Sequence, residues 1–304
     1  MEKNVYELFR NDSLFPEQLR CVKPKINKLY AWGNVNLLGS KSVAIVGSRN
    51  SSKYGDFMTR KIIKDLVKYN ITIISGMAIG IDAIAHDECL RNGGNTIAIL
   101  GSGFNKIYPK ENAWLLYKII ENNGLILSEY SYNEPVQKKN FPKRNRIISG
   151  LSEAVVVIEG SYRSGTSITA RNAVIQGKKL FYVPNCVGGK NSYESIKLAK
   201  DGAKIATCGS DIYNEIGGED IDTYELKIKE KNNNLNKAIS KLDRESKLVF
   251  FCIKKIGSLS CNKISEITKI EIVKVNQILS LLELSDLICS ADINNYKIRE
   301  EFCE

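Results

Sequence analysis

Residues 43–75 read VAIVGSRNSSKYGDFMTRKIIKDLVKYNITIIS, and this stretch decides the fold. Two apolar, β-branched runs, at 43–47 and 71–75, flank a segment at 57–69 whose apolar residues recur at helical spacing. Because the apolar runs are continuous rather than alternating, they predict strands that are buried on both faces. The strand–helix–strand order is typical of a parallel sheet covered by helices.

The same alternation continues toward the C-terminus. Further apolar runs stand at 96–100, 125–129, 154–159, 180–184 and, more weakly, 203–207. The sequence therefore predicts a doubly wound, mainly parallel α/β sheet. Ligands of such sheets bind at the carboxyl ends of the strands, so functional residues are expected in the turns that follow each strand.

Other segments flank the sheet domain, which we place at 43–216. Residues 1–42 are predicted to be a short N-terminal lead-in packed on the core. Residues 217–242 are polar and contain an Asn triplet, which predicts a linker. Residues 243–304 contain three helical patterns and two short strand patterns around an Asn-Asn turn, and this order predicts a C-terminal winged-helix domain.

Composition limits the classes of function. The chain has 304 residues and a formal net charge of +10, which favours polyanionic partners such as nucleic acid, although a Lys-rich proteome would give the same charge. Without an apolar run of membrane-spanning length or an apolar signal-peptide region, we expect a cytoplasmic protein that contacts no membrane. The eight cysteines form no C-x-x-C pair and His86 is the single histidine, so we expect no metal and no cofactor.

Three predicted turns carry glycine and hydroxyl residues that suit an anion. Ser48 and Arg49 follow the first strand and offer a hydroxyl and a guanidinium beside a helix start; the alternative is a tight turn with a solvated arginine. Gly76 follows the second strand and allows close approach of the backbone. Ser164 and Thr166 open a later helix, which predicts a second hydroxyl-rich anion site.

The segment 137–152, QKKNFPKRNRIISGLS, gives the strongest indication of a ligand. Its first ten residues contain no acid and five basic side chains, which are Lys138, Lys139, Lys143, Arg144 and Arg146. Phe141 stands among them. Basic residues around an exposed aromatic ring suit single-stranded nucleic acid, because phosphates meet the cations and a base stacks on the ring. The alternative is a solvated basic loop anchored by a buried Phe141.

Three titratable residues could be catalytic, but the sequence favours structural roles for them. Asp82 and His86 are four apart on a predicted helix, and the spacing places no Ser or Cys nucleophile beside them. Glu159 ends a buried strand without an obvious second carboxylate, and a hydrogen bond to an arginine or a backbone amide would explain it. We therefore expect that the chain is not an enzyme.

Taken together, the motifs resemble those of the DNA-processing protein A family (DprA, also called Smf). The resemblance covers roughly residues 15–210 and consists of eight motifs in order, among them FPEQL, AIVGSR, ISGMAIGIDAIAH, FPKRNRIISGLS and FYVP. It implies an extended Rossmann-like fold that binds single-stranded DNA without sequence preference and forms a homodimer. It also implies protection of incoming strands and loading of RecA onto them in natural transformation and recombination.

The resemblance further implies which residues form the DNA pocket. Carried over motif by motif, they are Ser48, Arg49, Gly76, Lys138, Phe141, Arg144, Asn145 and Arg146, with Ser164 and Thr166 at the edge. The chain departs from the family at Pro184-Asn185, where Pro-Gly is common, so no DNA contact is assigned to the loop that follows.

Two other functions remain open. One is a nucleotide-processing enzyme similar to the nucleoside monophosphate phosphoribohydrolases, although residues 160–169 lack the second Gly and the catalytic Glu of their motif. The other is a duplex-binding regulator that acts through the winged helix. Its candidate recognition helix, 270–284, offers Asn276 and Gln277 for base edges but no arginine.

Overall fold

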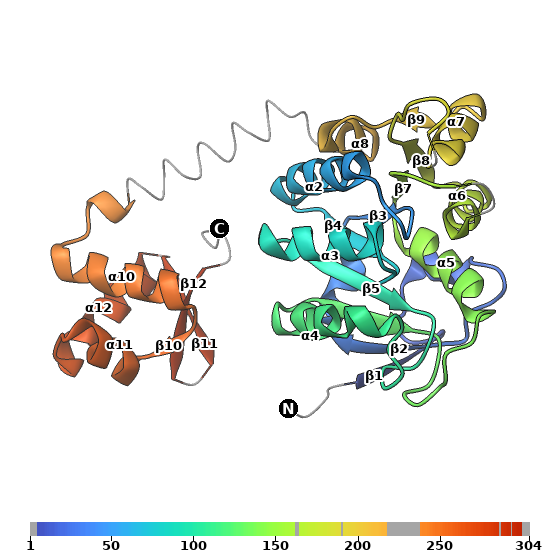
Figure 1. Cartoon of the computed structure of the whole chain (residues 1–304). Coiled ribbons are helices and arrows are strands. Elements are labelled where there is room, and N and C mark those ends of the chain that lie inside the picture. The colour runs from blue at the N-terminus through green and yellow to red at the C-terminus, as the bar shows by residue number, and fades with distance from the viewer. Residues whose placement is uncertain are drawn as a thin grey trace. The chain divides into compact units, whose positions relative to one another are not determined.

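The computed structural model describes residues 5–161, 164–189, 191–217, 238–285, 287–292 and 294–299. The chain forms two compact units, Met1–Gly218 and Glu219–Glu304 (Figure 1). The first unit holds the large sheet that the apolar runs predict. Most of the predicted linker, 217–242, lies outside the described residues.

A nine-stranded sheet forms the centre of the first unit, in the order β1-β2-β6-β5-β4-β3-β7-β8-β9. The strands from β3 to β9 run parallel to one another, whereas β6 pairs with β2 in the antiparallel sense. They are β3 (Ser42–Val46), β4 (Thr72–Ser75), β5 (Thr96–Leu100), β6 (Leu125–Ser128), β7 (Ala154–Val157), β8 (Lys179–Tyr182) and β9 (Lys204–Ile205). This arrangement confirms the predicted doubly wound, mainly parallel sheet.

Helices cover both faces of the sheet, and this explains the continuous apolar runs. One face packs against α2 (Lys53–Lys68), α3 (Ile81–Arg91), α4 (Ala113–Glu121) and α8 (Gly209–Glu215), and the other against α5 (Asn140–Leu151), α6 (Gly165–Ile175) and α7 (Tyr193–Lys200). In β3, Val43 and Ile45 belong to the first core and Ala44 and Val46 to the second. Each strand residue is therefore buried whichever way it points.

The N-terminal 42 residues, which are expected to pack on the core, also add two strands to the sheet. β1 (Val5–Phe9) and β2 (Lys28–Gly33) form an antiparallel pair that extends the sheet beyond β6. Between and after these strands lie α1 (Glu17–Arg20) and the short 3-10 helix η1 (Val35–Gly39).

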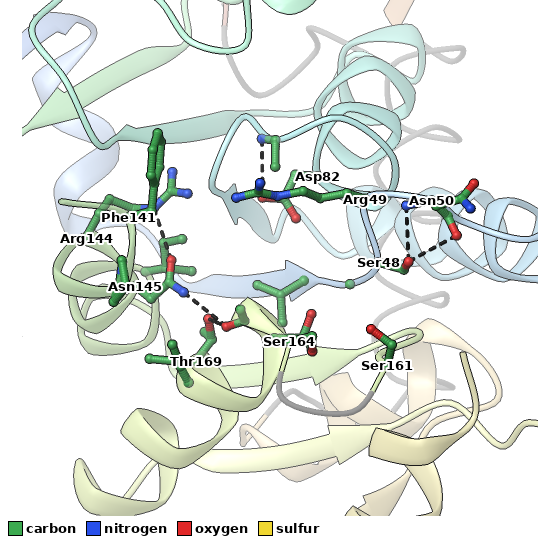
Figure 2. Close-up of a pocket in the computed structure, with 18 of the residues that line it drawn as sticks. Ser48, Arg49, Asn50, Asp82, Phe141, Arg144, Asn145, Ser161, Ser164 and Thr169 are labelled. Atoms are coloured by element: carbon green, nitrogen blue, oxygen red, sulfur yellow. Dashed lines mark hydrogen bonds between the residues drawn. The ribbon is translucent and has the colours of Figure 1, made fainter. Parts of the chain in front are cut away.

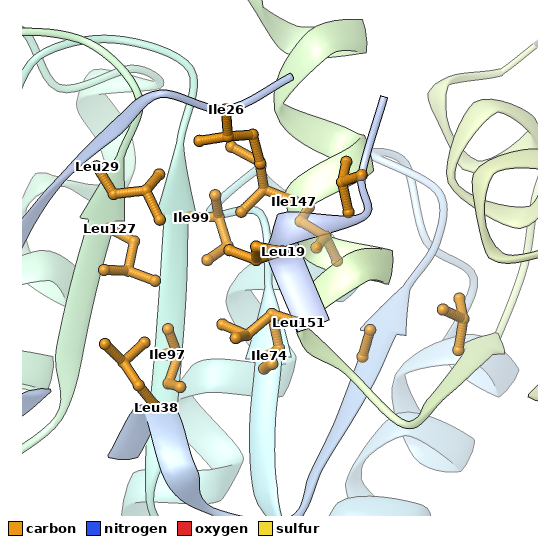
Figure 3. Packing of buried hydrophobic residues seen from close by; sticks show 14 of the residues in the cluster. Leu19, Ile26, Leu29, Leu38, Ile74, Ile97, Ile99, Leu127, Ile147 and Leu151 are labelled. Carbon is orange, nitrogen blue, oxygen red and sulfur yellow. The ribbon is translucent and has the colours of Figure 1, made fainter. Parts of the chain in front are cut away.

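Apolar side chains of this segment hold α5 in place. Leu19 and Ile26 are fully buried in one cluster with Ile147 and Leu151 of α5 (Figure 3). Burying such a side chain contributes about 1.5–3 kcal/mol. The N-terminal segment thus helps to fix the helix that carries Phe141.

The order of the strands creates a crevice beside β3. The chain runs from β3 outward through β4, β5 and β6, and then returns to place β7 on the other side of β3. The chain leaves β3 toward α2 on one face of the sheet and leaves β7 toward α6 on the other face, so the two turns diverge. The crevice between them is the general location of ligand sites in open α/β sheets.

The second unit contains α10 (Arg244–Ile256), β10 (Leu259–Ser260), α11 (Cys261–Thr268), α12 (Ile272–Leu284), β11 (Ile288–Asp292) and β12 (Asn295–Ile298). β11 and β12 form an antiparallel pair, and the sheet order is β10-β12-β11. The helices enclose a core that includes Phe250, Ile264 and Leu279. The winged-helix assignment of this unit stays a prediction.

Over the described ranges, no helix combines the length and the apolar character that a membrane crossing requires.

Candidate functional site

A pocket of about 650 Å³ lies at the carboxyl ends of β3 and β7 (Figure 2). Its walls come from the turn after β3, the turn after β7, the first half of α5 and the first turns of α6. Eight of the ten predicted site residues line it, namely Ser48, Arg49, Lys138, Phe141, Arg144, Asn145, Ser164 and Thr166. Segments about 90 residues apart in the chain thus meet at one site, as the topology requires.

The mouth of the pocket combines a cation with aromatic rings. The guanidinium carbon of the exposed Arg49 lies 5.9 Å from the centroid of the half-buried Phe141 ring. The ring of Tyr108 lies 5.4 Å from that of Phe141. A Cβ atom at Gly101 would stand 2.9 Å from Phe141, so only glycine lets the ring sit this close to the backbone. A flat ligand can therefore meet a ring and a positive charge together.

The turn after β3 is closed by its own polar groups. The Ser48 hydroxyl donates to the carbonyl of Asn50 at 3.0 Å and accepts from the Asn50 amide at 3.1 Å. The Asn191 side chain donates to the same carbonyl at 2.9 Å. Asn191 also lines the pocket, so the loop after Pro184-Asn185, to which no contact was assigned, contributes to the site.

The start of α6 forms another wall. Ser164 is the N-cap residue and makes no side-chain capping bond, while Thr166 is buried in the first turn and lines the pocket. The Asn145 amide donates to the carbonyl of Gly165 at 3.1 Å and ties α5 to α6. The first amides of a helix lack partners within the helix and carry positive partial charge, so this wall suits an anion.

Arg144 forms the floor of the pocket rather than a free cation. It is 4 % exposed, and one of its terminal nitrogens donates to the carbonyls of Gly76 and Ile99. Burial lowers the pKa of Arg144 to about 10, while the neighbouring Asp82 acts in the opposite direction. A Cβ atom at Gly76 would stand 2.7 Å from the guanidinium carbon. Gly76 thus makes room for Arg144, and it borders a small adjoining cavity with Phe141.

Arg146 does not line the pocket, in contrast to the expectation. Its guanidinium pairs with Glu129 at 2.7 and 2.9 Å, and its side chain is 5 % exposed. Successive helix residues are rotated by about 100°, so residues 144 and 146 point in different directions. The exposed Lys139 and Lys143 also lie outside the lining, which leaves Arg49 and Lys138 as the exposed cations among the lining residues that the structure describes.

Glu159 is fully buried and organises the start of α2. It accepts two hydrogen bonds from Ser52, one from the amide at 2.9 Å and one from the hydroxyl, and two from the side chains of Asn191 at 3.1 Å and Asn185 at 3.4 Å. Ser52 is in turn the N-cap of α2. These contacts fit the structural role that the sequence favours. Among the described residues, no cluster of three or more His, Cys, Asp or Glu could hold a metal ion.

His86 is buried in the core and is not among the residues that line the pocket. It is 0 % exposed, and its Nδ1 lies 2.7 Å from the Thr96 hydroxyl. Burial lowers the pKa of His86 to about 3, and the positive charge of Arg144 acts in the same direction. The imidazole is therefore neutral in the folded chain at physiological pH.

Acid is therefore expected to destabilise the fold through His86. Its pKa is about 6.5 in an unfolded chain and about 3 in the folded one. The stability that it contributes is present above pH 6.5 or so and is lost as the pH falls toward 3. Between about pH 7 and pH 5 the free energy of unfolding should fall by about 2 kcal/mol from this group alone. Urea unfolding of the wild type and of His86→Gln at both pH values measures this fall in the free energy of unfolding. An equal fall in the variant contradicts its assignment to His86.

Comparison with known proteins agrees with the motifs. The sequence model described as DNA recombination-mediator protein A matches residues 7–217. DNA processing protein DprA of Streptococcus pneumoniae is 40 % identical over 204 residues, 67 % of this chain and 72 % of that protein. Protein Smf of Escherichia coli is 39 % identical over 208 residues, and the chain spans only 56 % of its length.

A solved structure is also similar. DNA processing protein A of Helicobacter pylori, whose structure is described as showing a unique single-stranded DNA binding mode, superposes with a TM-score of 0.63. It is 29 % identical, and the match covers 71 % of this chain and 96 % of that one. The strand order, the motif series and these matches lead to one assignment: the chain belongs to the DNA recombination-mediator protein A family, which is the DprA/Smf family.

Proposed function

We propose that the chain binds single-stranded DNA, without sequence preference, in the pocket at the carboxyl ends of β3 and β7. The observation that carries the proposal is the placement of the Arg49 guanidinium beside the Phe141 ring at the pocket mouth. Lys138 adds an exposed cation to the lining, and the start of α6 adds backbone amides. A ring that takes a base and cations that take phosphates are the elements of sequence-tolerant strand binding.

The geometry favours unpaired over paired bases. Phe141 is half-buried and lies close to both Tyr108 and Arg49, so a base must leave its own stack to reach the ring. A single strand offers such bases at little cost, whereas a duplex must first be unpaired. The single-stranded DNA binding described for the Helicobacter pylori relative supports the same preference.

The proposal extends to the cellular role and the assembly. Family membership supports a protein that protects incoming single strands, loads RecA onto them in natural transformation and recombination, and works as a homodimer. The proposed function includes no catalysis. A hydrolase mechanism would need a free carboxylate, whereas that of Glu159 accepts four hydrogen bonds from Ser52, Asn185 and Asn191.

Duplex binding by the second unit is the less favoured alternative. On the candidate recognition helix α12, Lys274 pairs with Glu245 at 2.5 Å, and exposed apolar residues such as Val273 and Leu281 stand on the same helix. Affinity for duplex DNA depends on cations that are free to meet phosphates. This surface suits contact with a protein better than contact with a duplex.

A salt titration of DNA binding tests the proposal. Oligo-dT should bind more tightly than a duplex of the same length. If Arg49 and Lys138 each neutralise one phosphate, the logarithm of the affinity should fall by about 1.4 per log unit of salt, since each neutralised phosphate of a single strand contributes about 0.7. Equal or tighter binding of the duplex, or affinity that does not depend on salt, would refute the proposal.

A further inference from the structure

Three exposed aromatic side chains follow the pocket along the chain. Tyr108 lines the pocket and is 46 % exposed, while Trp114 and Tyr117 on α4 are 53 % and 49 % exposed. Large aromatic rings gain much from burial, so a series of exposed ones is a sign of a binding surface. We refer to Tyr108, Trp114 and Tyr117 as the α4 track.

The α4 track begins at the same edge of the sheet as the pocket. Tyr108 and Phe141 are 5.4 Å apart between ring centroids, which joins the track to the pocket mouth. The side chain of the buried Asn112 donates to the carbonyl of Met77 at 2.9 Å and fastens the start of α4 to the turn after β4. Trp114 is the second residue of α4, so it stands near that edge.

Tyr117 continues the surface one turn further along α4. Residues three apart on a helix are neighbours on its surface, so Tyr117 follows Trp114 in the direction away from the pocket. The ring of Tyr117 meets the largely buried Trp32 edge-on, with 6.2 Å between the centroids. This contact fixes the ring while leaving about half of the residue accessible.

Positive charge accompanies the aromatic rings. The segment 106–118 contains three lysines and one glutamate, and Lys106 and Lys110 are exposed. The Lys118 ammonium lies 5.7 Å from the centroid of the Trp114 ring. Lys118 and Arg91 each pair with Asp87 at 2.7 Å, so this group of three keeps one net positive charge beside Trp114. Rings flanked by cations suit a polyanion with flat bases rather than an apolar protein surface.

We propose that the α4 track binds the bases of the single strand where it leaves the pocket. This inference rests on the proposed function and extends its site by a second region of base stacking. Short strands would fill the pocket alone, and longer ones would also cover Trp114 and Tyr117. Stacking of this kind is tolerant of sequence because every base has a flat face.

Binding of short and long oligo-dT to the full chain tests the inference. The strands are to be about 4 and about 16 nucleotides long, which is the range of site sizes of single-strand binding folds. Trp114→Ala should weaken binding of the long strand by about tenfold and leave the short strand unchanged, because one stacked base contributes about 1–3 kcal/mol. Trp114→Phe should keep most of the affinity. Phe57→Ala, which removes a 62 % exposed ring from α2, is the matched control and should change neither.

Tryptophan fluorescence gives a second readout. The chain has two tryptophans, and Trp32 is only 8 % exposed, so quenching by a stacked base should come from Trp114. The long strand should quench the wild type but not Trp114→Phe, and the short strand should quench neither. If Trp114→Ala binds both strands like the wild type, the α4 track is refuted and the pocket stands. If the wild type binds neither strand, the proposed function fails and the α4 track with it.

Discussion

Phe141→Ala is expected to weaken the binding of oligo-dT by about 5- to 150-fold, because stacking of one base on an aromatic ring contributes about 1–3 kcal/mol. The ring lies 5.4 Å from that of Tyr108 and 5.9 Å from the guanidinium carbon of Arg49, so its removal takes away the stacking surface at the pocket mouth. The measurement is the affinity for oligo-dT at one fixed salt concentration, since affinities at different salt concentrations are not comparable.

The salt dependence separates the ring from the cation. Arg49→Ala should weaken binding and also reduce the salt slope by about 0.7, because one phosphate contact is lost. Phe141→Ala should leave the slope unchanged, because a neutral ring releases no counterions. The double variant should lose less than the sum of the two single losses, since Arg49 and Phe141 are in contact.

Conservative replacements give the controls. Phe141→Tyr keeps a ring of the same size and should bind nearly as the wild type does. Phe57→Ala removes an exposed ring of α2 that lies outside the pocket lining and should have no effect. If Phe141→Ala and Arg49→Ala both bind like the wild type, the DNA site lies elsewhere on the chain.

The central strands could be predicted from the sequence because burial on both faces leaves a strong local signal. The run 43–47 corresponds to β3 at Ser42–Val46, and 71–75 to β4 at Thr72–Ser75. β1 and β2 could not be predicted in the same way, because β1 is the edge strand, β2 is its neighbour, and exposed or half-buried residues interrupt the apolar pattern in both. In β1 only Leu8 is buried, and no local signal marks its pairing with β2.

The candidate site could be located from the sequence, but the roles of its residues could not all be assigned. The turns after parallel strands meet at one edge, so Ser48 and Phe141 could be placed together without coordinates. The same argument would have added Tyr108 and Asn191, which follow β5 and β8. A count of basic residues gives the charge of a segment but not the direction of each side chain, which depends on the phase of the helix.

Arg144 is the residue whose predicted role changes most. We expect its replacement to lower the free energy of unfolding of the chain, and not only to weaken DNA binding. Its guanidinium satisfies the carbonyls of Gly76 and Ile99 at the ends of β4 and β5. It also offsets the charge of Asp82. Burial raises the pKa of the Asp82 carboxyl, and the positive charge of Arg144 acts in the opposite direction. Arg144→Met should therefore lower the free energy of unfolding by about 3–5 kcal/mol, as for other buried charges that lose a partner.

Urea unfolding of three variants measures this role. Lys138→Ala is the matched control, because it removes an exposed cation of the same pocket and should change stability by no more than about 0.5 kcal/mol. Asp82→Asn combined with Arg144→Met removes both buried charges and should recover part of the loss, since no buried carboxylate is then left without its counter-charge. If Arg144→Met is as stable as the wild type but binds DNA weakly, Arg144 is a phosphate contact after all. If Arg144→Met folds, is less stable than the wild type and regains DNA binding at low temperature, then the role of Arg144 is to hold the pocket in shape.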